Sequence, residues 1–191
     1  MTRMMQKGMI HKLADLMNTQ EWAFRVQLSG ERLQHDGIEF NSSLKNSQSD
    51  LGEKMENEQI HFGNNSKVNA DVYYFVLSLA NYIKALNKLP KKLQIERFLG
   101  IKTKILSIRN IREHWEDNNL EKLITRNLTD RSKKNFKVFQ NRAKDFPVLP
   151  FLLSISKNGD VTIADSIKVV WVLEMILLNN KIIEEFRLQS L

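Results

Sequence analysis

The chain has 191 residues, of which 42% are hydrophobic, and it carries 29 Lys and Arg against 22 Asp and Glu, a formal net charge of +7. This length predicts one domain with a buried core, spanning residues 1–191. The positive charge favours a polyanionic partner such as RNA, although a basic surface that binds nothing fits the charge equally well.

The chain contains no cysteine. Disulfides, thiolate metal sites and cysteine nucleophiles are therefore excluded, which is typical of a protein in a reducing compartment. The N-terminal residues show no signal-peptide pattern, and the longest apolar run, residues 169–178, is too short to cross a bilayer. We expect a cytoplasmic protein that does not insert into a membrane.

The first predicted element is a helix over residues 20–33, where apolar residues recur at helical intervals. Gly30 weakens this prediction because glycine disfavours a helix interior. From residue 36 to 69 the chain is polar and rich in Asn, Ser and Gln. This composition predicts a helix end and a loop, with room for one short helix around residues 51–59.

Two further helices are predicted in the middle of the chain. Residues 72–89 are apolar around most of a helix circumference, which is typical of the central helix of a bundle. The next helix is predicted over residues 92–118. One apolar stripe runs along it, made of Phe98, Ile101, Ile105, Ile108 and Trp115.

The last third of the chain changes character twice. Residues 126–145 form a basic insertion, and alternating apolar residues on both sides of Asn158-Gly159 then predict a β-hairpin over residues 151–164. A largely buried helix over residues 167–187 closes the chain. The whole pattern predicts a mainly α fold, a helical bundle with one β-hairpin before the C-terminal helix.

The helix over residues 92–118 carries Arg109 and His114 on either side of a polar face, at about 100° and 120° from Ile108. The two side chains splay by roughly 140°, too far for one straight helix to hold a small group between them. A second copy around a two-fold axis would bring both pairs to one cleft and would give Leu106, which is alone among polar neighbours, a partner. We therefore expect a homodimer.

The stretch Arg109-Asn110-Ile111-Arg112-Glu113-His114 resembles the signature of the HEPN superfamily. That signature is an arginine, four to six residues and then a histidine, on a helix of a small all-helical domain, and a polar residue often follows the arginine. The resemblance covers the motif helix well and the bundle in outline. The basic insertion and the hairpin depart from the family pattern and leave the subfamily open.

The resemblance implies a helical bundle, a homodimer with a composite cleft and metal-independent endoribonuclease activity, with no cofactor. Many relatives are toxins or antiviral defence proteins, often paired with an antitoxin. Others have lost catalysis and bind nucleotides, RNA or a protein partner. The resemblance therefore implies RNA as substrate and allows an antitoxin-like partner, with a non-catalytic binding protein as the alternative.

The predicted catalytic residues match the chemistry of RNA cleavage by the 2′-hydroxyl. His114 titrates near neutrality and can act as base or acid, and Arg109 can donate two parallel hydrogen bonds to phosphate oxygens. Asn110, one turn before His114, could orient the imidazole or the ribose. The alternatives are a surface imidazole at His114 and a surface ion pair between Arg109 and Glu113, which lies one turn away.

A second candidate site lies in the basic insertion, where four cations interleave with two phenylalanines. The predicted RNA-binding residues are Lys133, Lys134, Lys137 and Arg142. Phe136 and Phe139 could stack on bases, but they could equally anchor a helix to its own core. The other histidines, His11, His35 and His61, look isolated and predict no metal site.

Overall fold

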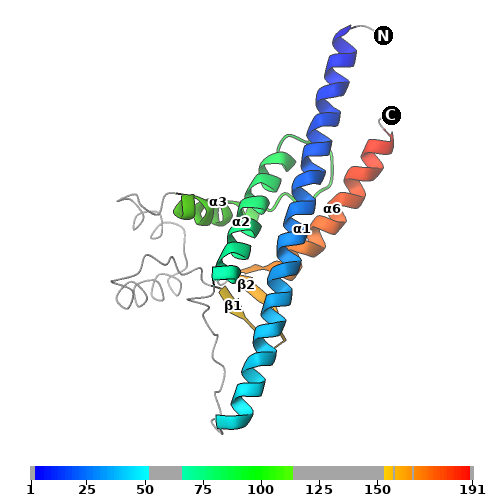
Figure 1. Ribbon diagram of the computed structural model, residues 1–191. Coiled ribbons are helices and arrows are strands. Elements are labelled where there is room, and N and C mark those ends of the chain that lie inside the picture. The colour runs from blue at the N-terminus through cyan, green and yellow to red at the C-terminus, as the bar shows by residue number, and fades with distance from the viewer. Residues whose placement is uncertain (1–2, 52–65, 114–152, 157, 165, 190–191) are drawn as a thin grey trace.

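The computed structural model describes residues 3–51, 66–113, 153–156, 158–164 and 166–189. Within these ranges it contains four helices and three short strands (Figure 1). In chain order they are α1 (Arg3–Leu51), α2 (Ser66–Leu86), α3 (Leu99–Glu113), β1 (Leu153–Ile155), β2 (Val161–Ile163), β3 (Ile167–Lys168) and α6 (Val169–Gln189). This architecture confirms the predicted mainly helical bundle with a hairpin before the C-terminal helix. The predicted basic insertion at 126–145 lies outside the described residues.

Helix α1 is one continuous helix of 49 residues, packed against α2 and α6 (Figure 1). The predicted helix end and loop after residue 36 are therefore wrong, and most of the short helix predicted at 51–59 lies outside the described residues. Buried positions recur along α1 at alternating steps of three and four residues. They are Leu16, Thr19, Ala23, Val26, Gly30, Leu33 and Gly37. This seam packs against α2, α6 and β2, which carries the helix past residue 36, where the loop was predicted.

Gly30 and Gly37 lie inside this buried seam and do not interrupt the helix. A Cβ atom added at Gly30 would lie 2.8 Å from the side chain of Leu173 on α6. One added at Gly37 would lie 2.8 Å from Val161 on β2 and 3.1 Å from the carbonyl oxygen of Gly159. Both glycines are thus sites of close approach between elements, and a larger residue would require its neighbours to shift.

Helix α2 is the central helix, as predicted, and packs against both α1 and α3. Its largest fully buried side chains include Phe75, Leu79 and Tyr82. The end of α2 is held by Arg97, whose guanidinium donates hydrogen bonds to the carbonyl oxygens of Leu86 and Pro90. These carbonyls lie at or just beyond the helix C-terminus, where a cation interacts favourably with the helix dipole.

The predicted hairpin is confirmed. Strand β1 pairs antiparallel with β2, with Leu153 opposite Ile163 and Ile155 opposite Val161. Gly159 in the turn has φ 86°, a left-handed conformation that favours glycine. A third strand, β3, pairs with β2 and extends the sheet, so α6 begins at Val169 and not at residue 167 as predicted. Pairing of Ile167 with Ile163 supplies the strand hydrogen bonds that delay the helix start.

Candidate functional site

The segment before α3 is not helical, and it fixes where the motif helix begins. The predicted start at residue 92 is therefore wrong, because α3 begins at Leu99. The fully buried amide of Asn179 on α6 accepts a hydrogen bond from the backbone N–H of Glu96 and donates one to the Glu96 carbonyl, both at 2.8 Å. These bonds replace helical hydrogen bonds for Glu96 and hold the segment against α6.

Phe98 makes the turn into α3. Its φ of 56° is left-handed, and its backbone N–H donates to the carboxylate of Glu96. Its buried ring contacts Tyr82 at a centroid distance of 6.0 Å and Trp171 at 5.6 Å, both edge to face. Aromatic contacts of this kind stabilise the turn although a non-glycine residue occupies it. The carbonyl of Phe98 then accepts the first helical hydrogen bonds of α3.

Helix α3 buries the predicted apolar stripe as far as the structure describes it. Ile105 and Ile108 are buried and Ile101 is half-buried, while Trp115 lies outside the described residues. Leu106 is also half-buried and packs against the core. Leu106 is therefore not alone among polar neighbours, because it packs against its own bundle, and a partner for its exposed part stays a prediction.

Arg109 is half-buried, and its Nε atom is buried. The prediction placed it outside the core beside a polar face, so the structure puts it deeper than expected, at the edge of the packed side of α3. The long apolar stem of arginine can pack against core residues while the guanidinium reaches the surface. This partial burial restricts the positions that the guanidinium can take.

The structure describes less of the other two predicted catalytic residues. Asn110 lies within α3, next to Arg109. His114 follows the last described residue of the helix, Glu113, and is outside the described residues, so the distance between Arg109 and His114 stays a prediction. The predicted RNA-binding residues Lys133, Lys134, Lys137 and Arg142 also lie outside the described ranges.

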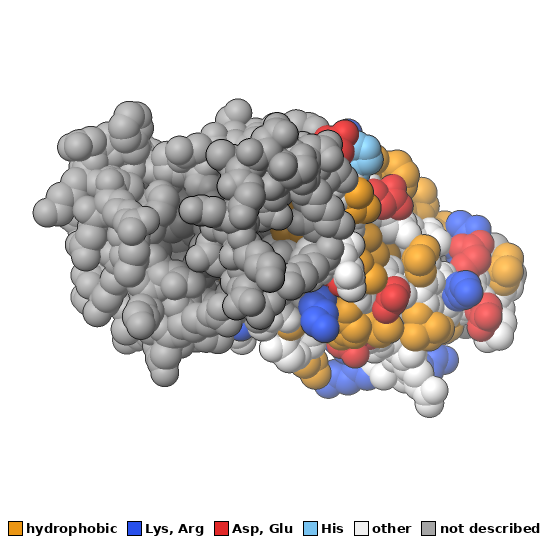
Figure 2. All heavy atoms as spheres, turned by 90° about the horizontal axis from the view of Figure 1, so that it is seen from below, with side chains coloured by type: hydrophobic (Ala, Val, Ile, Leu, Met, Phe, Trp, Pro, Cys, Tyr) orange, Lys and Arg blue, Asp and Glu red, His pale blue; other side chains and the backbone are white. Residues whose placement is uncertain are grey.

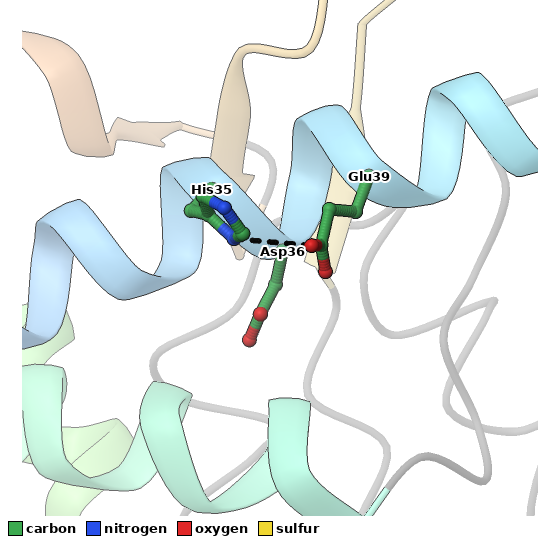
Figure 3. Close-up of side chains that lie close together, drawn as sticks. All are labelled: His35, Asp36 and Glu39. Carbon is green, nitrogen blue, oxygen red and sulfur yellow. Dashed lines mark ion pairs between the residues drawn. The ribbon is translucent and has the colours of Figure 1, made fainter.

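A histidine cluster on α1 was not predicted. His35 lies 3.7 Å from the carboxylate of Glu39, and ligand atoms of His35, Asp36 and Glu39 all lie within 4.8 Å of one another (Figure 3). The prediction that His35 is isolated is therefore wrong. The available signal is the i, i+4 spacing of His35 and Glu39, but it indicates a contact only on a helix, and the sequence predicts a loop after residue 36. These groups could hold a cation, but exposed residues at this spacing commonly form a surface ion pair.

A shallow hollow of about 390 Å³ lies where the strands meet α6. Its lining combines one cation, Lys168, with the carboxylates of Asp160 and Glu174, beside the ring of Trp171. Lys104 of α3 donates a hydrogen bond to Ser166 at the rim. Mixed charges of this kind select neither anions nor cations, so the hollow offers no defined chemistry.

Asn179 is the structural residue of this site that the sequence analysis did not single out. An asparagine within the otherwise apolar inner side of the last helix was the available signal, because a buried amide needs hydrogen-bond partners.

No helix among the described residues is long and apolar enough to cross a membrane. Comparison with known proteins found no matching family model, curated protein or solved structure.

Proposed function

We propose that this protein is a metal-independent endoribonuclease of HEPN type, in which Arg109, Asn110 and His114 act at a cleft shared by two copies. The observation that carries the proposal is the placement of Arg109. It lies on a helix, as the motif requires, at the partly buried edge of the packed side. A toxin or antiviral defence role with an antitoxin-like partner is the biological setting that the resemblance suggests.

The hydrogen bonds before α3 support a catalytic role for this helix. Asn179 and Phe98 fix its start, and Ile105 and Ile108 fix its buried side against the bundle. A helix held at its start and along one side presents its remaining side chains in constant positions. Catalysis by charge stabilisation depends on such preorganised donors.

The proposed reaction uses the 2′-hydroxyl of RNA as nucleophile on the adjacent phosphorus. One His114 takes the proton of the 2′-hydroxyl, and an imidazole from either copy gives a proton to the departing 5′-oxygen, so a 2′,3′-cyclic phosphate and a 5′-hydroxyl form. Arg109 donates two hydrogen bonds to the phosphate oxygens while negative charge develops on them. Asn110 orients the imidazole or the ribose.

The test compares cleavage of labelled RNA in EDTA by the wild type, Arg109→Ala and His114→Ala. Each variant should lose activity by roughly 100-fold or more, as removal of an acid, a base or a charge-stabilising donor does. Arg32→Ala is the matched control, because it removes an exposed arginine from α1 without touching α3. Equal cleavage by all four proteins would discard the catalytic proposal.

The second candidate function is a non-catalytic helical protein that binds RNA or a protein partner. Apolar side chains exposed on α1 and α6 favour it, and such side chains lie among the charged ones in the view of Figure 2. Such a protein would bind RNA without turnover. Charge reversal at Lys133, Lys134 and Lys137 would then weaken binding more than His114→Ala.

A further inference from the structure

Helix α1 carries a second apolar stripe besides its buried seam. The α1 stripe consists of Ile10, Leu13, Met17, Phe24 and Leu28, whose exposed fractions range from 39% to 64%. At about 100° per residue these five positions fall within a sector of about 60°, on the side of α1 opposite the buried seam. Every position in that sector between residues 10 and 28 is apolar.

Helix α6 adds two exposed apolar side chains on the far side of the groove between the two helices. The amide of Gln20 on α1 donates a hydrogen bond to the carboxylate of Glu184 at 3.0 Å, and Gly30 faces Leu173. These contacts fix which sides of α1 and α6 face each other. On α6, Leu177 and Leu188 fall just beyond the contact, on the outer side, and are 53% and 64% exposed.

We propose that this outer apolar face, made of the α1 stripe with Leu177 and Leu188, binds the same face of a second copy of this chain. The seven side chains expose roughly 750 Å² per copy, and the α1 stripe alone exposes roughly 500 Å², which is near the upper end for the largest apolar patch of a typical monomer, about 300–600 Å². Covering both copies buries roughly 1,500 Å², the size of a standard stable interface.

The pattern of the stripe fits a two-fold axis. Its end residues lie at equal distances from a midpoint near residue 19, so two antiparallel copies of α1 place Ile10 opposite Leu28, with Gln20 and Glu21 near the axis. The steps of three, four and seven residues are those of a helix–helix seam. No charged side chain lies within the sector between residues 10 and 28 that would select a partner of opposite charge.

The outer apolar face is separate from the proposed cleft. Helix α3 packs against α2, whereas the outer face belongs to α1 and α6 on the other side of the bundle (Figure 1). A pair formed through the outer face therefore leaves the two α3 helices apart. The two contacts are independent, and both together would give an assembly of four copies with two kinds of two-fold axis.

The test measures molar mass by light scattering for the wild type, Leu177→Glu and Leu178→Glu. Leu178 is the matched control, because it is 50% exposed on the same helix but points about 100° away from the outer face. Leu177→Glu should halve the mass or weaken association by about 30-fold or more, because it places a charge inside the proposed apolar contact. Leu178→Glu should keep the wild-type mass, and circular dichroism should show both variants folded.

The outcomes separate this proposal from the ribonuclease proposal. If the wild type contains two copies and Leu177→Glu dissociates them, the outer interface is supported and the shared α3 cleft is contradicted. If the wild type contains four copies and Leu177→Glu reduces them to two, both proposals are supported. Two copies that Leu177→Glu leaves intact overturn the outer interface alone. A monomer at all concentrations overturns both, and a monomer that binds vesicles of anionic lipid assigns the stripe to a membrane surface instead.

A crosslink gives an independent readout, since the chain has no cysteine of its own. A single Met17→Cys substitution places a thiol near the middle of the α1 stripe, where the proposed axis brings it close to its copy. Mild oxidation should convert Met17→Cys to a covalent dimer at least about tenfold faster than Leu178→Cys, given the geometric demands of a disulfide. Equal rates for the two proteins would contradict the proposed face.

Discussion

At the scale of single residues, Asn179 contributes most to the placement of α3. Its amide group is fully buried and makes three hydrogen bonds, two to the backbone of Glu96 and one to the hydroxyl of Tyr82 at 3.2 Å. The bonded segment is 83 residues away in sequence. Loss of this side chain would leave two backbone groups of Glu96 without their partners in the interior, which is costly.

Replacing Asn179 by leucine of similar volume should lower the free energy of unfolding by about 2–4 kcal/mol. Denaturant unfolding of Asn179→Leu measures this loss. The neighbouring Asn180 is the matched control, since its buried Oδ1 atom accepts no hydrogen bond from the described part of the chain. Asn180→Leu should leave the stability within about 1 kcal/mol of wild type. Equal losses in the two variants would contradict the assigned role of Asn179.

Tyr82 gives a prediction for the pH dependence of stability. Burial raises the pKa of Tyr82 from 10.0 to about 12, against a smaller lowering by its hydrogen bond with Asn179. Between pH 10 and 12 the unfolded chain loses this proton before the folded chain does. The contribution of Tyr82 to the free energy of unfolding should therefore be fully present below pH 10. It should fall by about 2–3 kcal/mol as the pH rises to 12.

The comparison of wild type with Tyr82→Phe isolates this effect, because lysines titrate in the same range in both proteins. Phenylalanine has no proton to lose, so the stability difference between the two proteins should shrink as the pH rises from 9 to 11. Urea unfolding at each pH measures it. A difference that stays constant over this range would show that Tyr82 ionises equally well in the folded and unfolded chains.

At the scale of elements, Gly37 shows how α1 and the hairpin meet. Alanine favours helix over glycine by about 1 kcal/mol, but a Cβ atom at Gly37 would lie 2.8 Å from Val161 and 3.1 Å from a backbone carbonyl. We expect Gly37→Ala to destabilise the protein by about 1–3 kcal/mol in spite of the helix propensity. Thermal or urea unfolding measures the change.

Gly100 is the control for this substitution. It lies in the first turn of α3, and an added Cβ atom would meet no atom within 4 Å. Gly100→Ala should therefore leave the stability unchanged or raise it by up to about 1 kcal/mol. Gains in both variants would mean that α1 and the hairpin can separate by a few tenths of an ångström without cost.

The elements that the sequence predicted well are those specified by nearby residues. Asn158-Gly159 between alternating apolar residues predicts the hairpin, because the turn and the pairing need no distant partner. The course of α1 through Gly30 and Gly37 depends instead on Leu173 and Val161, more than a hundred residues away. The start of α3 likewise depends on Asn179. Local composition does not contain these contacts, so the two predictions failed.

The predictions for the candidate site also succeeded where nearby residues specify the structure and failed where distant residues do. The helical setting of Arg109 follows from the apolar spacing of α3, and the stripe predicted the buried side through Ile105 and Ile108. The depth of Arg109 did not follow, because periodicity gives a direction around the helix but not how far neighbouring elements extend over its edges. The partial burial of Leu106 did not follow for the same reason.

At the scale of the whole molecule, the bundle presents two separate sides with different chemistry. One side carries α3 with Arg109, and the other carries the outer apolar face of α1 and α6. The net charge of +7 suits an RNA ligand, whereas the apolar face suits a copy of the chain. The proposed RNA cleft and the proposed outer interface lie on different sides of the bundle, so separate substitutions should test them.

The length of α1 has a consequence for how its first turns become ordered. Residues 10–14 are all exposed, and Leu16 is the first buried position among the side chains that the structure describes. A helical overhang without lateral contacts has close to equal populations of coil and helix in water, since backbone hydrogen bonding alone is only marginally favourable. The free energy of any binding at Ile10 and Leu13 must therefore offset the conformational entropy that these turns lose when they become fully helical. Ile10 and Leu13 should therefore contribute less to any interface than Phe24 and Leu28, which lie among buried positions of α1.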